Sequence, residues 1–550
     1  MSKAQLLFKR AAGFILVLGL CLPLGGVTQA RAADSADFKV QEGGFYKDVF
    51  DQNLYYEGMQ FLDFGRLWRM ISRKKTRAAN LNAYDEVPDS TFFVNRHARK
   101  RLSAAELESG RRETPGPDLS RPLTVTQGIF VKVNPAFYVR DAKGDEYLLK
   151  FDPIGYPELS TSAEVVANRF FHALGYNVPQ TDIFFFAESQ MVPAPDAVTY
   201  DDSGFKRPLT RERLADYLLF IPRLPDGRFR AVAIKTPAGE DKGTFHFQGR
   251  RKNDPSDPVP HELRRDLRAV QVFGSWVGYD DMRESNTQDR LTEENGQKVL
   301  KHYLMNFASA LGAGEEESKT PMITHEYLFD YEEATKAYLT LGLWQKPWQK
   351  RIMEAGEKSD VSPAIGYFDN RYFDPGKFKF MLPQYVFKDL SRADAFWAAK
   401  TILAFSDDDI RAVTRAGKYT KDSDAAYVAK TLAERRDLIA KYWFEKSAPL
   451  DAFDVAGGKL VFTDLAADHK LRPSEGTVYL VDVLVQNGKK AKKIDSTEVS
   501  SPSIDLQNWL SRHESIVLRI RVKRSGSTQA GPYVLVELNT GGIVRIEHQD

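Results

Sequence analysis

Cysteine is almost absent from this chain of 550 residues, which holds only Cys21. Cys21 lies in an apolar run near the N-terminus, and the rest of the chain has no cysteine. That part of the chain therefore has no disulfide, no thiol nucleophile and no cysteine-ligated metal. The chain also lacks a P-loop sequence, a GxGxxG, an HExxH and a GxSxG. It has no internal repeat and no low-complexity tract. These absences exclude the commonest nucleotide, zinc-protease and serine-hydrolase motifs.

Excess charge of one sign is also missing. The formal net charge is +2 at pH 7, with 42% hydrophobic and 28% charged residues. Such a balance gives no global basic field, so we expect no nucleic-acid partner. A chain of this length and composition buries a large core and is expected to form two or three domains.

Long hydrophobic runs are confined to residues 11–24. Lys3, Lys9 and Arg10 precede this run, and Ala30-Arg31-Ala32 follows it as a small-x-small sequence. This pattern predicts a secretory signal peptide over residues 1–32, cleaved after Ala32. The apolar run is shorter than the roughly 20 residues that span a bilayer. We therefore expect an exported protein, periplasmic or extracellular, with no transmembrane segment after cleavage.

Signal cleavage has two further consequences. It removes Lys3, Lys9, Arg10 and Arg31, which changes the net charge from +2 to about −2. Lipidation of Cys21 would need a small residue before it, and Leu20 is not small, although the sequence leaves lipidation open.

Hydrophobic periodicity predicts the rest of the organisation. Residues 33–120 form an aromatic and helical extension, and residues 121–240 a β-rich part with one helix. Residues 241–446 are mainly helical, and residues 450–550 are short alternating strands typical of a β-sandwich-like domain. Strands, one helix, more strands and then a helical half is the order of a two-lobed kinase-like fold. The predicted class is α+β, with a β-rich N-lobe, a helical C-lobe and a small all-β C-terminal domain.

Residues 261–312 contain the arrangement that suggests chemistry. An amphipathic helix ends near Gly278, a polar loop covers residues 280–289, and a hairpin leads to a strand over residues 299–307. Asp281 and Asn286 are five residues apart in the loop, and Asn306 ends the strand. In a phosphotransferase, Asp281 would accept the acceptor's proton, Arg283 would neutralise charge, and Asn286 and Asn306 would ligate a metal.

Phosphoryl transfer also needs a cation that holds the phosphates and an acid that holds the cation. Lys150 ends a predicted strand, and Glu164 lies fourteen residues on, in the expected first turn of the next helix. Lys150 would contact phosphate and Glu164 would pair with it. Each piece alone also fits an ordinary strand-end lysine, a helix-start acid or a solvated turn. The ordered combination favours the phosphotransferase interpretation.

Longer runs carry a resemblance. DEVPDSTFFVNR, YLLKFDPIGYPELSTSAEVVANRFFHALGYNVPQ, HFQGRRKNDPSDPVPHELRRDLR, DDMRESNT and HYLMNFASALG resemble an uncharacterised bacterial family. That family is similar to the protein-kinase-like superfamily that includes HipA toxins and phosphatidylinositol kinases. The resemblance covers roughly residues 80–445 and implies a kinase-like fold with ATP and Mg²⁺ or Mn²⁺ as cofactors.

The chain departs from that pattern at two places. Asn306-Phe307-Ala308 stands where relatives carry an Asp-Phe-Gly-like triplet, and Mg²⁺ prefers a carboxylate to an amide oxygen. Pro135-Ala136 stands where the phosphate-covering turn of the family has Pro-Gly, which hinders the approach of the backbone to phosphate. Asp280 or Asp289 is an alternative source of the missing carboxylate.

These observations leave three functions open. The first is an exported kinase-like protein that acts as a pseudokinase or as a binding or scaffold protein. The second is an active, atypical, metal-dependent phosphotransferase with Asp289 or Asn306 beside Asn286 on the metal. The third is an envelope interaction protein that acts through residues 450–550 on an unknown partner.

Overall fold

The computed structural model describes residues 38–56, 75–131, 134–200, 205–314, 316–320, 322–346, 348–349, 362–487, 490–527 and 530–549. Lys39–Asp550 form one compact unit. The predicted signal peptide and Cys21 lie outside the described residues, so export stays a prediction. Within the described ranges, no helix combines the length and the apolar character needed to cross a bilayer.

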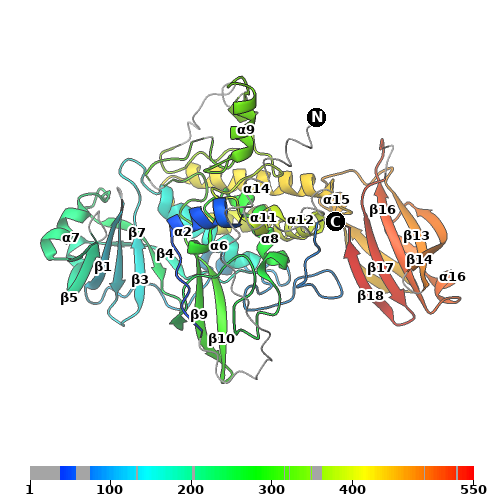
Figure 1. Cartoon of the computed structure of the whole chain (residues 1–550), viewed down its shortest axis with the longest axis horizontal. Helices are drawn as coiled ribbons and strands as arrows, with labels where there is room; N and C mark the ends of the chain where they lie inside the picture. Colours follow the sequence, from blue (N-terminus) through cyan, green and yellow to red (C-terminus); the bar gives the residue numbers. More distant parts are fainter. Residues whose placement is uncertain are drawn as a thin grey trace, which may run out of the picture. The chain divides into compact units, whose positions relative to one another are not determined.

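The N-terminal part begins with two short helical elements, α2 (Phe45–Phe50) and the π-helix η1 (Asp51–Tyr55), drawn in dark blue in Figure 1. Further on, α5 (Ala104–Ser109) starts at Ser103. The Ser103 hydroxyl accepts from the Glu106 amide at 3.2 Å, and the Glu106 carboxylate accepts from the Ser103 amide at 2.8 Å. This reciprocal capping explains why the helix starts directly after Ser103.

A seven-stranded sheet follows, with the order β4-β7-β3-β2-β1-β5-β6. All its neighbouring strands are antiparallel except β1 and β5. Its strands are β1 (Leu123–Val131), β2 (Asn134–Arg140), β3 (Glu146–Lys150), β4 (Thr181–Phe186), β5 (Met191–Tyr200), β6 (Lys206–Pro208) and β7 (Phe229–Lys235). The short helices η2 (Glu188–Gln190) and α7 (Arg211–Leu218) lie in its connections.

Helix α6 (Leu159–Leu174) connects β3 to β4 and is buried on nearly all sides. Val165 packs with Ile183 and Val232 of the sheet, whereas Phe170 packs with Trp276 in the helical part. A helix that is apolar on opposite sides can join two layers. Helix α6 therefore fixes the sheet against the helices that follow it.

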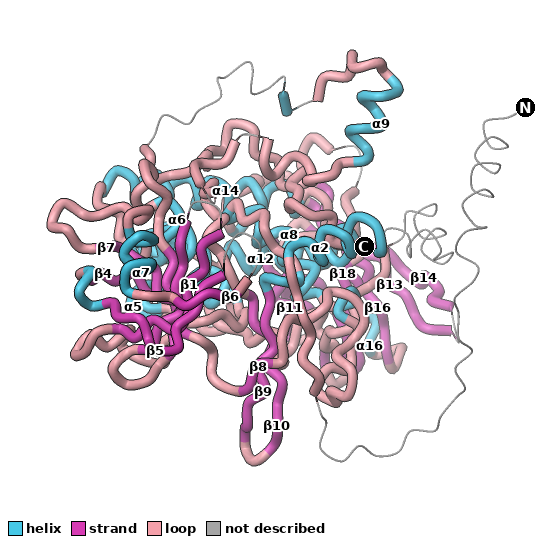
Figure 2. The backbone as a smooth tube through the Cα atoms, turned by 60° about the vertical axis from the view of Figure 1, so that its left-hand side comes forward, coloured by secondary structure: helices cyan, strands magenta, loops and turns pink. Residues whose placement is uncertain are grey.

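The predicted helix, loop and hairpin of residues 261–312 are present. The 3₁₀ turn η3 (His261–Leu263) precedes α8 (Arg265–Val277), and the 3₁₀ turn η4 (Glu284–Asn286) precedes β9 (Thr287–Glu294) and β10 (Gln297–Leu304). With β8 (Glu240–Asp241) these strands form a three-stranded sheet. Figure 2 shows the β9–β10 hairpin extending from the loops around it. Asn295 and Gly296 both have positive φ (51° and 74°), which suits the tight turn.

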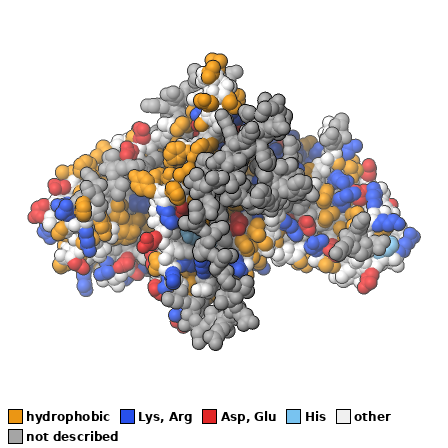
Figure 3. Space-filling model, viewed as in Figure 1, with side chains coloured by type: hydrophobic (Ala, Val, Ile, Leu, Met, Phe, Trp, Pro, Cys, Tyr) orange, Lys and Arg blue, Asp and Glu red, His pale blue; other side chains and the backbone are white. Residues whose placement is uncertain are grey.

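In the next part, the regular elements of the described residues are helices joined by long loops. Helices α8, α12 and α14 share the largest hydrophobic cluster. Hydrophobic side chains gather over the end of α9 on the face drawn in Figure 3, where Tyr338 and Leu339 are exposed. The helices are α9 (Tyr331–Leu339), α11 (Tyr385–Lys388), α12 (Arg392–Leu403), α13 (Asp407–Arg415) and α14 (Asp422–Phe444).

Two small sheets close the chain, in the orders β11-β12-β15 and β14-β13-β16-β17-β18. They share one hydrophobic cluster, to which Leu460 and Ile504 contribute from the first sheet and Val481, Leu518 and Val536 from the second. The elements are β11 (Leu450–Ala456), β12 (Lys459–Asp464), α15 (Leu465–Asp468), β13 (Val478–Asn487), β14 (Lys490–Val499), β15 (Ser503–Asp505), α16 (Gln507–Leu510), β16 (Ser515–Lys523), β17 (Tyr533–Asn539) and β18 (Gly542–His548). The α+β class and the separate all-β sheets at the C-terminus are confirmed.

Three local predictions are wrong. Glu164 is not in the first turn of α6, because the helix starts at Leu159. The Asp152 carboxylate fixes this start: it accepts from the Thr161 amide and from the Thr161 hydroxyl, each at 2.8 Å. Pro135 and Ala136 lie inside β2 rather than in a turn, since Ala136 pairs with Lys150 of β3. Strand β10 ends at Leu304, two residues before Asn306.

Candidate active site

The site begins where α8 stops. Gly278 has left-handed backbone angles (φ 64°, ψ 29°), which a glycine adopts without the strain of a side chain. A Cβ at this position would lie 3.1 Å from Phe368 and 3.3 Å from Arg435. The Tyr279 amide then bonds to the Gly274 carbonyl at 2.9 Å. This sharp helix end turns the chain into the loop that carries Asp281 and Asn286.

Asp281 is held from two sides. The Asn286 amide donates to the Asp281 carbonyl at 2.6 Å and to its carboxylate at 3.0 Å, and Arg283 forms an ion pair with the other carboxylate oxygen. Burial raises the pKa of Asp281 to about 6, aided by the neighbouring Asp280 carboxylate and opposed by Arg283. A carboxylate with this pKa can both accept and release a proton near neutral pH.

Asn306 joins the loop to the sheet. The Met305 amide bonds to the Asn286 carbonyl at 2.9 Å, after which Asn306 takes a left-handed conformation with φ 61°. The side-chain amide of Asn306 donates to Asn286 Oδ1 at 3.1 Å, and Lys150 Nζ donates to Asn306 Oδ1 at 2.6 Å. A chain of polar contacts therefore runs from Asp281 through both asparagines to Lys150.

Lys150 also forms an ion pair with Glu164. Its ammonium lies 3.5 Å from the Glu164 carboxylate, which α6 presents toward the end of β3. Glu164 is fully buried, and neither of its carboxylate oxygens has a hydrogen-bond partner among the described residues. A buried carboxylate in this state depends on the charge of Lys150 for stabilisation. The structure thus brings together Lys150, Glu164, Asp281, Arg283, Asn286 and Asn306.

Asp289 does not join this group. It lies in β9, fully buried, with His302 Nδ1 at 2.6 Å and Arg251 Nη1 at 3.3 Å. Asp280, the other candidate carboxylate, forms an ion pair with Lys319. Both carboxylates are therefore paired with other side chains.

The assembled residues fit a phosphate group better than a resident metal. Lys150 supplies a cation, and the orphaned Glu164 carboxylate holds that cation in place. The oxygens of Asn286 and Asn306 face hydrogen-bond donors, and the described residues include no group of three or more His, Cys, Asp or Glu that could hold a metal ion. Hard divalent cations prefer several oxygen ligands that include carboxylates.

Two residues at the site gave no signal in the sequence. Asp48 of α2 accepts from the Ser285 amide at 2.9 Å and from the Ser285 hydroxyl at 2.5 Å. Lys319 pairs with Asp280 and also donates to the Ser309 carbonyl. Asp48 and Ser285 are 237 residues apart, so no local pattern could have linked them.

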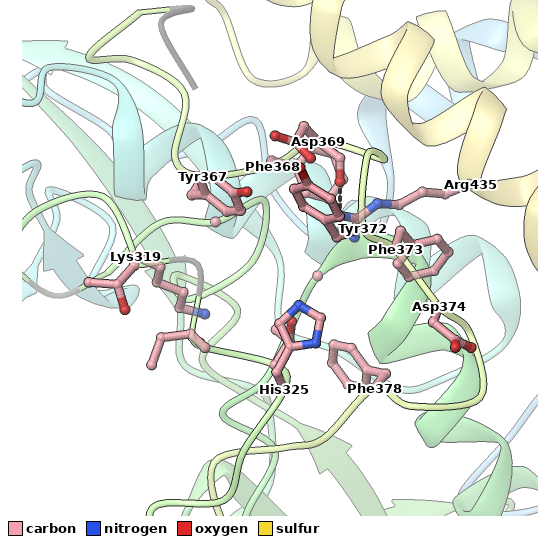
Figure 4. Close-up of a pocket in the computed structure, with 15 residues that line it drawn as sticks. Lys319, His325, Tyr367, Phe368, Asp369, Tyr372, Phe373, Asp374, Phe378 and Arg435 are labelled. Atoms are coloured by element: carbon pink, nitrogen blue, oxygen red, sulfur yellow. Dashed lines mark hydrogen bonds between the residues drawn. The ribbon is translucent and has the colours of Figure 1, made fainter. Parts of the chain in front are cut away.

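A small cavity lies at the end of α8, lined by Gly278, Lys319, Asp369 and Arg435 among others (Figure 4). The Arg435 guanidinium lies 4.0 Å from the ring centre of Phe368 and donates to the Asp369 carbonyl at 2.9 Å. Burial lowers the pKa of Arg435 to about 9. With a volume of about 40 Å³ the cavity has room for only a few waters and is too small for a nucleotide.

No protein-family model and no curated protein matches the chain. Among solved structures it is similar to the Helicobacter pylori proinflammatory kinase CtkA, at 13% identity and a TM-score of 0.31 over 60% of this chain and 99% of CtkA. It is also similar to the Golgi casein kinase, at 9% identity and a TM-score of 0.28 over 76% of this chain and 94% of the other. These scores are too low to carry an argument, and the function rests on the site.

Proposed function

We propose that this chain is a kinase-like protein with an atypical phosphotransfer centre. The observation that carries the proposal is the polar chain from Glu164 through Lys150, Asn306 and Asn286 to Asp281. It links a phosphate-binding cation to a loop carboxylate, the two parts that phosphoryl transfer needs most.

Each residue has a distinct task in this proposal. Lys150 binds phosphate oxygens, and Glu164 holds the Lys150 ammonium in position. Asp281 takes the proton from the acceptor hydroxyl, for which a pKa of about 6 is suitable. Asn286 orients Asp281 through one hydrogen bond to its carboxylate and one to its backbone carbonyl. A bound nucleoside triphosphate would supply the phosphoryl group.

A pseudokinase is the second candidate. Lys150 already donates to Asn306 Oδ1 at 2.6 Å, where kinase-like relatives would have a carboxylate. An amide there weakens the hold on a divalent cation. A protein of this kind binds nucleotide, or only a partner protein, without transferring phosphate.

A thermal-shift titration with ATP and Mg²⁺ or Mn²⁺ tests the proposal. ATP at 100 times its Kd should stabilise the full chain by about 2.7 kcal/mol. The shift should disappear in Lys150→Met and persist in Lys143→Met, a control at an exposed lysine that pairs with Asp118. No shift at millimolar ATP in the unmodified chain would contradict nucleotide binding.

Transfer of the terminal phosphate to protein or peptide acceptors then separates the two candidates. An active centre loses transfer in Asp281→Asn while it keeps the ATP-induced thermal shift. Nucleotide binding without transfer under any metal condition supports the pseudokinase.

A further inference from the structure

Residues 39–56, here called the N-terminal strap, have an unusual distribution of polarity. In α2 and η1 the buried side chains are polar: Asp48, Gln52 and Asn53 are 1–4% exposed. The large apolar side chains point outward, with exposed fractions of 52–86% for Tyr46, Phe50, Leu54 and Tyr55. A helix that packs permanently on a protein core shows the opposite distribution.

The buried polar face lies on the proposed catalytic loop. Asp48 accepts both hydrogen bonds of Ser285, and its carboxylate lies 3.9 Å from Arg283 Nε. The ring centre of Phe45 lies 4.9 Å from the Arg283 guanidinium carbon. Arg283 is thus enclosed by the strap on one side and by Asp281 on the other.

Backbone contacts hold the start of the strap. The Gln41 amide donates to the Lys242 carbonyl at 3.0 Å, and the Thr244 amide donates to the Gln41 carbonyl at 3.0 Å. A Cβ on Gly43 would lie 2.4 Å from a side-chain carbon of Thr244. The strap is therefore attached on both sides of Gly43, close to Thr244 and Ser285.

This arrangement restricts access to Asp281. Its side chain is only 7% exposed, and Arg283, held by Asp48, occupies one of its oxygens. An acceptor hydroxyl must come within hydrogen-bond distance of that carboxylate. Arg283 and the strap have to move before an acceptor can do so.

The strap is suited to such movement. Asp48 on its buried face makes two hydrogen bonds with Ser285, which water can replace at small net cost, and the strap buries few large apolar side chains. Segments attached in this way open at a lower free energy than the core. We propose that the N-terminal strap is a displaceable inhibitor of the Asp281 site, with Asp48 as the contact that keeps it closed. The inference rests on the proposed function and names a regulation of the same site.

The first experiment measures amide hydrogen exchange of residues 282–286 in the full chain. Asp48→Ala and the milder Asp48→Asn should raise exchange there, because both weaken the acceptor of the Ser285 amide. Tyr46→Ala, an exposed residue of the same helix, is the matched control and should leave exchange unchanged. Unchanged exchange in both Asp48 variants overturns the proposal. This readout does not require ATP binding or activity.

The second experiment locks the strap. The Gly43→Cys, Thr244→Cys pair in a Cys21→Ser background places two cysteines at positions where a Cβ on residue 43 would lie next to the side chain of residue 244. Oxidation should suppress phosphate transfer, and reduction should restore it. The Asp48 variants should transfer phosphate roughly five- to tenfold faster than the unmodified chain. This is the change expected when the loss of one or two hydrogen bonds shifts the equilibrium between the closed and the open strap.

The two proposals fail in distinguishable ways. Absence of any ATP-induced thermal shift contradicts the proposed function, whereas the exchange result still decides whether Asp48 holds the loop. Slower transfer in Asp48→Asn, with ATP binding retained, would overturn the inhibitor and make Asp48 a residue that positions the loop for catalysis.

Discussion

At the scale of single residues, Asp281 combines burial with a charged neighbourhood. Its pKa is raised to about 6, from an ordinary value of 3.8, chiefly because its charge is removed from water. Between these two values the folded state binds more protons than the unfolded state. The stability of the fold therefore falls as the pH rises through this window. The carboxylate that suits catalysis is thus expected to destabilise the folded protein at neutral pH.

Asp281→Asn should remove this pH-dependent cost. At pH 8 we expect the variant to be more stable than the unmodified chain, by up to about 3 kcal/mol for a shift of about two pKa units. At pH 4 the difference should nearly vanish, because the carboxyl is protonated in the folded state. Unfolding in urea at both pH values measures it, with the exposed Asp408→Asn as a control. An equal difference at both pH values would contradict the assigned pKa.

Glu164 depends on Lys150 in a similar way. Lys150→Met leaves a fully buried carboxylate without its cation. We expect a loss of roughly 1–3 kcal/mol, below the cost for a fully buried pair because Lys150 is partly exposed. Lys150→Met combined with Glu164→Gln should recover part of this loss, which a double-mutant cycle measures. Simple additivity of the two changes would show that the pair does not couple.

At the scale of elements, the end of α8 decides where the loop lies. Gly278→Ala introduces both a strained backbone conformation and a Cβ close to Phe368 and Arg435. The cost should be about 1–3 kcal/mol. Gly227→Ala is the matched control, since Gly227 also has a positive φ (83°) but open space around it. Thermal unfolding compares the two. Equal destabilisation would mean that packing at Gly278 contributes nothing.

Features determined by neighbours in sequence could be predicted from the sequence. The helix stop at Gly278 and the hairpin turn at Asn295-Gly296 each depend on residues a few positions apart. Asp281 and Asn286, which are in contact, are also only five residues apart. Local chemistry is sufficient for such features.

Features determined by distant contacts could not be predicted. The first turn of α6 was misplaced because Asp152, seven residues before Leu159, caps the helix from outside. The end of β10 was misplaced because Asn306 takes a left-handed conformation (φ 61°), directly after the Met305 amide makes a last in-register bond to the Asn286 carbonyl. Nothing near Asp48 in the sequence indicates that it meets Ser285.

At the scale of the whole molecule, Asp85 connects parts that lie far apart in the chain. Its carboxylate accepts from Arg77 at 3.0 Å, from Arg265 of α8 at 3.2 Å and from His548 Nδ1 at 3.0 Å. Burial alone would raise the pKa of Asp85, but Arg265 and His548 together hold it well below its usual range. Its stabilising effect is therefore present above about pH 4 and lost as the pH falls through the lowered value.

Asp85→Ala should loosen this connection. The change leaves Arg265 and His548 buried with one acceptor fewer, at an expected cost of about 3–5 kcal/mol near pH 7. Amide exchange should rise in β18, which ends at His548, more than in β13 of the same sheet. Asp89→Ala, in the same stretch of chain, is the control. A uniform rise in exchange over both strands would show that Asp85 contributes only to global stability.

The position of Asp48 near the start of the chain also has a consequence for the timing of folding. Its partner Ser285 is made 237 residues later. At roughly 5–20 residues per second, synthesis separates the two residues by on the order of 10–50 seconds. During that interval the N-terminal strap has been made, but the loop with Ser285 that it contacts has not. Once the loop has been made, the strap is already available to bind it. A newly completed chain is therefore expected to fold directly into the state in which the strap covers the loop.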